Sequence, residues 1–168
     1  MWYVIQVITG DEKNTVNMCK AIVHESTEHE FFIPETDRKK RLKGKWHNIR
    51  KPMFPGYVFI STEGMDELYE ELKNVPKLTK VLGTDNMVTP ISQPEERLIK
   101  RLTNKQHVAE MSVGYIEGDK LIISEGPMIG MEAMVKKIDR HKRIAILSIT
   151  MFGNSTDVTM GLEVLHKK

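Results

Sequence analysis

The sequence is poor in the residues that build redox, metal and nucleophilic sites. A single cysteine, Cys19, has no partner in the chain for a disulfide or for a pair of thiolate metal ligands. It lies on the apolar side of a predicted helix, which favours a small buried thiol over a nucleophile. The scarcity of cysteine fits a protein of the reducing cytoplasm.

The sequence also lacks the spacing patterns of catalytic sites. Its histidines are scattered, without the close spacing of a metal-binding pair: His24, His29, His47, His107, His141 and His166. The glycine-containing segment 126–130 has no lysine and does not fit a phosphate-binding loop, and no Gly-x-Ser-x-Gly elbow is present. We therefore expect no enzymatic activity, no metal and no cofactor.

No apolar run is long enough to cross a membrane. The run over residues 1–10 falls short of the roughly 20 residues that a membrane helix needs. No basic segment precedes it and no small-residue cleavage site follows it. With 40% hydrophobic and 29% charged residues, the chain has the composition of a folded, soluble protein, and we expect it in the cytoplasm.

The net charge of +2 is too small to indicate nucleic-acid binding, but the cations are grouped in two blocks. Residues 38–51 contain eight Lys or Arg residues and no acid. Residues 136–143 contain five Lys or Arg residues and His141 beside a single acid, Asp139. Both blocks are candidate contacts for phosphate groups.

The first 104 residues alternate between strand and helix patterns. Predicted strands cover 2–8, 31–33, 56–60 and 80–82, and predicted helices cover 11–24, 65–75 and 92–102. Thr9 with Glu12 and Ser92 with Glu95 are typical helix starts. The order βαββαβα predicts an α+β sandwich with the first basic block in a hairpin loop.

The pattern changes after residue 104. Residues 105–117 lack a sustained apolar period and are predicted to be a linker. Short β-rich segments follow at 120–123, 131–138, 143–151, 157–160 and 163–165. Five short strands within about fifty residues predict a small closed β-barrel. The sequence thus predicts domains at 1–104 and 118–168, joined by the linker.

Three segments, in this order, resemble the NusG family of transcription elongation factors. They are residues 2–6 (WYVIQ), residues 54–58 (FPGYV) and residues 118–153. The first two resemble the family's N-terminal NGN domain, and Gly118-Asp119 with Glu125-Gly126-Pro127 resembles a KOW motif. The resemblance implies an NGN domain followed by a KOW domain with a five-stranded SH3-like β-barrel.

The resemblance also implies binding to RNA polymerase. The family's N-terminal domain docks on the clamp helices of the largest polymerase subunit through an apolar patch, to which Phe54, Pro55, Tyr57 and Phe59 correspond. Aromatic anchors dominate many protein interfaces. We expect Phe54 and Tyr57 at the interface, whereas Phe59 fits the core and the interface equally.

The KOW half carries a candidate partner contact, Phe152. It matches the loop phenylalanine with which well-known members contact a small-subunit ribosomal protein or the termination factor Rho. The arginine that usually follows is absent, because residues 154–156 read NST, and Met128 and Met131 stand where aromatic residues are common. These departures move the expectation from ribosome or Rho coupling towards RNA recognition.

The first basic block is expected at a hairpin tip beside polymerase-bound DNA, with Trp46 available to stack on a base or to anchor the loop. A solvated loop is the alternative. The candidate residues are Arg38, Lys39, Lys40, Arg41, Lys43, Lys45 and Trp46.

The second block is expected to project from a KOW turn and to hold folded RNA by its phosphates and shape. A solubilising turn is the alternative. The candidate residues are Lys136, Lys137, Arg140, His141, Lys142 and Arg143. Such a turn resembles specialised paralogues of the family, the LoaP-type antiterminators that act on selected operons.

The sequence therefore predicts a monomeric, non-catalytic factor on elongating RNA polymerase. It would recognise nascent RNA and suppress pausing or termination, with upstream or non-template DNA as a further partner. One alternative is a housekeeping member that couples polymerase to the ribosome or Rho. Another is a KOW-type ribosome-associated RNA-binding protein.

Overall fold

The computed structural model describes residues 1–168 apart from 25–28, 77–79, 82, 85–86, 89 and 166–168. The described helices and strands form an α+β fold with a β-rich C-terminal half, as predicted. The chain divides into two compact units, each built from two stretches of sequence. The first unit combines Met1–Ile33 with Phe54–Glu96, and the second combines Pro34–Met53 with Arg97–Lys168.

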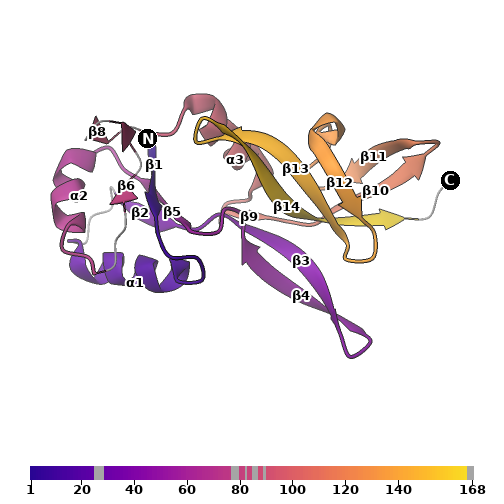
Figure 1. The fold of residues 1–168 in the computed structure, drawn as a ribbon, viewed down its shortest axis with the longest axis horizontal. Coiled ribbons are helices and arrows are strands. Elements are labelled where there is room, and N and C mark those ends of the chain that lie inside the picture. The colour runs from indigo at the N-terminus through magenta and orange to yellow at the C-terminus, as the bar shows by residue number, and fades with distance from the viewer. Residues whose placement is uncertain (25–28, 77–79, 82, 85–86, 89, 166–168) are drawn as a thin grey trace. The chain divides into compact units, whose positions relative to one another are not determined.

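The first unit contains a four-stranded antiparallel sheet with the order β2-β5-β1-β6. Its strands are β1 (Trp2–Gln6), β2 (Glu30–Phe32), β5 (Tyr57–Ser61) and β6 (Lys80–Val81). Helices α1 (Glu12–Ile22) and α2 (Met65–Leu72) cover one face of this sheet (Figure 1). Strands β7 (Gly83–Thr84) and β8 (Met87–Val88) pair separately, and α3 (Gln93–Leu102) follows them.

The core of the first unit lies between the sheet and these two helices. Ile5 and Ile60 project from neighbouring strands and pack with Cys19 of α1 and with Leu68 and Leu72 of α2. Cys19 is a buried free thiol, and burial raises its pKa to about 11. A thiol in this state is a poor nucleophile at neutral pH, which agrees with the structural role that the sequence favours.

The predicted start of α3 is confirmed. The hydroxyl of Ser92 accepts a hydrogen bond from the backbone N–H of Glu95 at 3.3 Å. The same hydroxyl donates to the Glu95 carboxylate at 3.0 Å. Residues 92–95 thus satisfy a backbone donor that would otherwise lack an intrahelical partner.

The second unit contains a five-stranded sheet with the order β11-β10-β14-β13-β12. Its strands are β10 (Ser112–Glu117), β11 (Lys120–Glu125), β12 (Val135–Asp139), β13 (Ile144–Met151) and β14 (Asn154–Leu165), with a short 3-10 helix η1 (Glu132–Met134) before β12. All neighbouring pairs are antiparallel except β10 and β14, which are parallel. Alternate residues of β13 and β14 are buried, among them Leu147, Met151 and Met160.

Three features of the C-terminal half differ from the sequence-based expectation. Within the strand predicted at 131–138, residues 132–134 form the 3-10 helix η1, and β12 begins only at Val135. Residues 105–117 are not a linker, because β9 (Val108–Ala109) pairs with β3 and β10 pairs with both β11 and β14. The strands predicted at 157–160 and 163–165 form one strand of 12 residues, β14. Distant backbone partners hold these segments in place, and local apolar periodicity does not reveal such partners.

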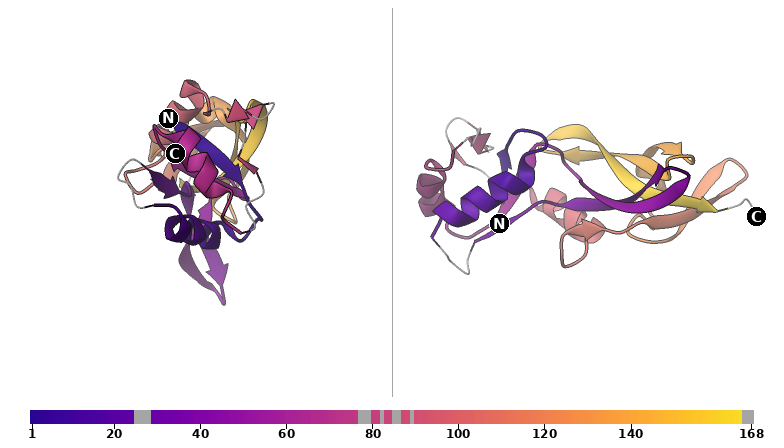
Figure 2. Two further views of the ribbon diagram at one scale, coloured as in Figure 1. Left: turned by 90° about the vertical axis from the view of Figure 1, so that its left-hand side faces the viewer. Right: turned by 90° about the horizontal axis from the view of Figure 1, so that it is seen from below.

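The first basic block is also not a loop. It forms a hairpin of two strands of eight residues each, β3 (Glu35–Leu42) and β4 (Lys45–Pro52), and β3 also pairs in parallel with β9 (Figures 1 and 2). The hairpin therefore belongs to the second unit, although it lies between β2 and β5 in the sequence.

Gly161 marks the closest approach of β14 to β3. A Cβ at this position would collide with the backbone oxygen of Asp37 and would lie 2.8 Å from Cγ of Met111. The two backbones can approach this closely only because residue 161 has no side chain. Gly161 is thus a fixed point between the hairpin and the five-stranded sheet.

We expect Gly161→Ala to destabilise the protein by about 1–3 kcal/mol, because the added methyl group forces the two backbones apart. Urea denaturation of the full chain measures the change. Thr150→Ala, at an exposed position of β13, is the control and should change stability by less than about 0.5 kcal/mol. Equal stability of the Gly161→Ala variant and the wild type would show that the approach is not tight.

Candidate interaction surfaces

The face of the first sheet that points away from α1 and α2 carries a cluster of aromatic rings. Trp2 meets Phe32 edge-on with 4.8 Å between ring centroids. Phe59 lies 5.7 Å from Phe32 and 5.7 Å from Phe54. Rings in such tilted and edge-to-face arrangements stabilise one another beyond their burial. All four rings are buried, so the cluster packs as an apolar core on this face of the sheet.

The four predicted polymerase-contacting residues differ in their exposure. Phe59 is 0% exposed and Phe54 is 3% exposed, so Phe54 packs on Phe59 instead of lying open at the surface as the sequence suggested. Pro55 is exposed and Tyr57 is partly exposed. The accessible part of the motif is therefore Pro55 and Tyr57, whereas the two phenylalanines are buried.

Glu12 holds the turn that carries this motif. Its buried carboxylate accepts hydrogen bonds from the backbone N–H of Gly10 at 3.0 Å and of Gly56 at 3.1 Å. Burial opposes ionisation, but the backbone donors outweigh it and lower the pKa of Glu12. Gly56 has φ +86°, and a Cβ there would lie 3.0 Å from Oγ1 of Thr9. The sequence identified Glu12 only as part of a helix start.

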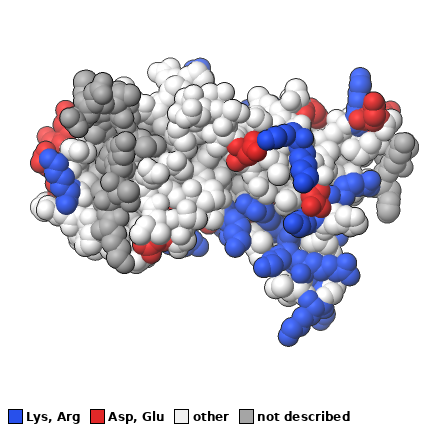
Figure 3. Space-filling view, in the orientation of Figure 1, with Lys and Arg blue, Asp and Glu red and all other residues white. Residues whose placement is uncertain are grey.

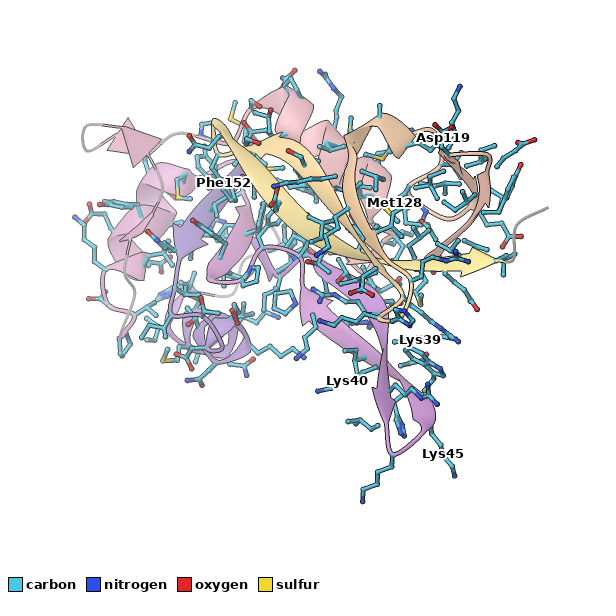
Figure 4. The ribbon with its side chains drawn as sticks, turned by 45° about the vertical axis from the view of Figure 1, so that its right-hand side comes forward. Lys39, Lys40, Lys45, Asp119, Met128 and Phe152 are labelled. Atoms are coloured by element: carbon cyan, nitrogen blue, oxygen red, sulfur yellow. The ribbon has the colours of Figure 1, made fainter. Side chains whose placement is uncertain are left out.

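The basic hairpin, which we define as β3, β4 and their connecting turn, distributes its cations along two strands. The turn is Lys43-Gly44, with φ 51° and 77°, between the paired residues Leu42 and Lys45. Lys39 and Lys40 point to opposite sides of the ribbon, and Lys45 lies at the tip (Figure 4). Only one of the predicted tip residues, Lys43, is in the turn itself.

Not all cations of the hairpin are open to a partner. Arg38 is partly buried, its Nε donates to Oγ1 of Thr36 at 3.0 Å, and burial lowers its pKa. Arg50 pairs with Asp37 at 2.8 Å, and this bond raises the pKa of Arg50. Within the described parts of the chain, five further exposed cations of the hairpin have no ion pair: Lys40, Arg41, Lys43, Lys45 and Lys51.

The basic turn, which we define as residues 136–143, joins β12 to β13. Asp139 accepts a hydrogen bond from the backbone N–H of Lys142 at 3.0 Å, and this bond lowers the pKa of Asp139. The carboxylate of Asp139, the one acid of the turn, therefore accepts a hydrogen bond from the backbone of the turn itself. Lys136 pairs with Asp157 at 2.9 Å. The remaining exposed groups of the turn are Lys137, Arg140, His141 and Lys142.

Arg143 and Trp46 bring the two basic segments together. The guanidinium carbon of Arg143 lies 4.0 Å from the centroid of the Trp46 ring, and Nη1 of Arg143 lies 3.9 Å from the Glu163 carboxylate. Arginine over the face of tryptophan is an attractive cation–π arrangement. Trp46 thus anchors the hairpin to the turn, which is one of the two roles considered from the sequence.

Phe152 occupies a two-residue turn between β13 and β14. It has φ 56° and Gly153 has φ 76°, and they connect the paired residues Met151 and Asn154. A left-handed backbone is costly for a bulky residue, so this turn keeps phenylalanine where glycine or asparagine is favoured. The side chain is partly exposed at the end of the hairpin (Figure 4).

Other kinds of site were sought in the described residues. Within these residues, no cluster of three or more His, Cys, Asp or Glu side chains is placed to hold a metal ion. Among the described helices, none is long and apolar enough to span a membrane.

The chain thus combines an α+β unit with an aromatic sheet face and a β-rich unit with basic surface segments. A family model described as "Transcription termination factor nusG" matches residues 1–116. The chain belongs to the NusG family, whose members are transcription factors that act with RNA polymerase.

Similar proteins match this chain at low sequence identity over most of their length. The transcription termination/antitermination protein NusG of Pasteurella multocida is 26% identical over 99% of this chain and 94% of its own. That of Thermus thermophilus is 28% identical over 99% of this chain and 97% of its own. The solved structure "Domain interaction in Thermotoga maritima NusG" has a TM-score of 0.56 at 21% identity, covering 95% of this chain and 92% of that one, and supports the fold.

We expect Glu12→Gln to lower stability by about 1.5–3 kcal/mol at pH 7, because hydrogen bonds to a charged acceptor are lost. Because the pKa of Glu12 is lowered on folding, this stabilisation is complete above the unfolded pKa of about 4.3 and is lost as the pH falls through the lower folded value. The difference between wild type and variant should therefore shrink on acidification below about pH 4.

Thermal unfolding between pH 3 and pH 7 measures this difference. Glu70→Gln is the control, since Glu70 is exposed on α2 and pairs with the exposed Lys73 at 3.1 Å. It should change stability by no more than about 0.5 kcal/mol. A Glu12→Gln protein that matches the wild type at pH 7 would contradict the role given to this carboxylate.

Proposed function

We propose that this chain is a non-catalytic antitermination factor of the LoaP type. It acts in the cytoplasm as a monomer, binds the clamp helices of RNA polymerase and recognises nascent RNA. By doing so it suppresses pausing or termination at selected operons. The observation that carries the proposal is the basic turn in the C-terminal unit of a NusG-family chain.

Polymerase binding is supported by the aromatic face of the first unit. Pro55 and Tyr57 are accessible, and the Glu12 carboxylate holds the backbone of Gly56 between them. Buried rings beneath them keep the motif in one conformation, which reduces the entropy lost on association. A tyrosine in this setting is a typical anchor of a protein interface.

RNA binding is supported by the composition and geometry of the basic turn. Lys137, Arg140 and Lys142 are exposed, and the single acid of the turn accepts a bond from its own backbone. Closely placed cations contact several phosphates at once and release the counterions that those phosphates had condensed. Neighbouring upstream or non-template DNA would meet the same chemistry at the basic hairpin.

A housekeeping role is the second candidate, and Phe152 favours it. A phenylalanine kept at φ 56° is a costly feature, and such strain is often found at functional positions. In this alternative Phe152 contacts a ribosomal protein or Rho, and the factor acts on most genes. A ribosome-associated RNA-binding protein is a third candidate, which the polymerase motif at residues 54–57 disfavours.

Immunoprecipitation from cells, followed by sequencing of the bound transcripts and by detection of polymerase, separates these candidates. The proposal predicts occupancy restricted to a few transcription units. Occupancy of most genes would favour the housekeeping role, and ribosomal subunits without polymerase would favour the third candidate.

We expect Tyr57→Ala to weaken polymerase co-purification about tenfold or more, since loss of an interface anchor costs roughly 1–2 kcal/mol or more. Tyr115→Ala, at a partly buried tyrosine of β10 in the other unit, is the matched control and should leave polymerase binding unchanged. Equal loss in both variants, at equal melting temperature, would contradict the assignment of the motif.

A further inference from the structure

The two basic segments lie far apart in the sequence and side by side in the second unit. The basic turn lies alongside β3 and β4, as two views of the ribbon show (Figures 1 and 4). In the space-filling view, Lys and Arg side chains gather over this region (Figure 3). The Arg143 guanidinium carbon, 4.0 Å from the Trp46 ring centroid, is the direct contact between them.

Backbone contacts keep this arrangement in place. Strand β3 pairs in parallel with β9, and Gly161 of β14 packs directly on the backbone of Asp37 in β3. Trp46 pairs with Arg41 across the hairpin, so the cation–π contact also places Arg41 next to the basic turn. The hairpin is therefore attached to the rest of the second unit at its base, through residues 35–37, and contacts the basic turn through Trp46.

The acidic side chains next to the two basic segments have partners within this region. Asp37 pairs with Arg50, Asp157 pairs with Lys136, and Asp139 accepts the N–H of Lys142. Glu163 lies 3.9 Å from Arg143. In the described part of the chain, the following cations make no ion pair: Lys39, Lys40, Arg41, Lys43, Lys45, Lys137, Arg140 and Lys142. The combined region thus has a large excess of positive charge.

We propose that the basic hairpin and the basic turn form one continuous surface that binds the phosphates of a single double-helical RNA. Trp46 and Arg143 act as positioning residues that hold the two parts together. The proposal rests on RNA binding by the basic turn, and it adds the hairpin, which the sequence assigned to a separate domain.

A double helix fits this surface better than a single strand. Proteins that bind single strands stack bases on aromatic rings, but here the guanidinium of Arg143 covers a face of Trp46. Successive side chains on one side of a strand are about 6.6 Å apart, and Lys39 and Arg41 lie on the side of β3 that faces Trp46, so the hairpin offers a short row of evenly spaced cations beside the basic turn. Such a row suits recognition of a regular helix by its backbone and shape.

Fluorescence anisotropy of the full chain with an RNA stem of about 20 base pairs and arbitrary sequence tests the surface. Titrations between about 50 and 200 mM KCl give the affinity and its salt dependence. One variant changes the hairpin cations on the Trp46 side and in the turn of the hairpin (K39S/R41S/K43S), and another changes the basic turn (K137S/R140S/K142S). The control removes three cations of the first unit, two from α1 and one directly after α2 (K13S/K20S/K73S).

We expect a one-to-one complex. Hairpin and turn variants should each weaken binding at least tenfold and lower the slope of log K against log salt by about 2–3, because each loses three phosphate contacts. The control variant should bind with the wild-type affinity. Its salt slope should differ from the wild-type slope by no more than about the contribution of one phosphate contact.

Each other outcome has a definite meaning. If only the turn variant weakens binding, the composite surface is overturned while RNA binding by the turn stands. If neither variant weakens binding, both proposals fail. Two RNA molecules per chain would also overturn a single surface. Equal binding of a DNA duplex of the same sequence, with the same losses in both variants, would overturn the assignment to RNA.

Trp46→Ala tests the positioning role, because it removes no charge. We expect it to lower the salt slope by about one or more, since the hairpin and the turn no longer meet the same helix. Trp46→Phe should restore the slope, because a phenyl ring still accepts a guanidinium group. An unchanged slope in Trp46→Ala, in a protein that melts cooperatively, would overturn the positioning role.

Discussion

The close contact between β3 and β14 at Gly161 determines how the second unit is built. A glycine in the middle of a strand usually weakens it, but here the missing side chain lets two backbones touch. This contact, with the parallel pairing of β3 and β9, takes the basic hairpin out of the first unit. The Trp46–Arg143 contact and the shared basic region both depend on it.

Local patterns predicted the first unit well. Apolar residues at helical spacing mark α1 and α2, each with one buried face, and short apolar runs mark β1 and β5, which are buried on both faces. The helix start at Ser92 is likewise a local feature, since its hydrogen bonds join residues three apart. Where structure depended on neighbours in the sequence, the prediction from sequence was sound.

The second unit was predicted less completely, because its strands depend on distant partners. Strands β3 and β4 are mostly polar and carry no alternating apolar pattern, so the block was taken for a loop. Strand β10 has partners in β11 and in β14, one adjacent and one distant, and was taken for part of a linker. No pattern in the neighbouring sequence predicts the pairing of β10 with the distant strand β14.

The candidate surfaces show the same limit. Both basic blocks and the residues of the polymerase motif were identified from the sequence. The exposure of these residues and the contact between the two basic blocks were not. Phe54 is buried against Phe59, and Trp46 is covered by Arg143, because side chains from elsewhere in the fold reach them. Glu12 was identified as a helix start, whereas its bond to Gly56 closes a turn distant in the sequence.

The contact between Trp46 and Arg143 can be observed directly in solution. The chain has two tryptophans, so an NMR spectrum of the indole N–H groups contains one signal for Trp46 and one reference signal for Trp2. The account predicts that Arg143→Ser shifts the Trp46 signal and leaves the Trp2 signal in place. A Trp46 signal that does not move on this substitution would contradict the joining of the hairpin to the turn.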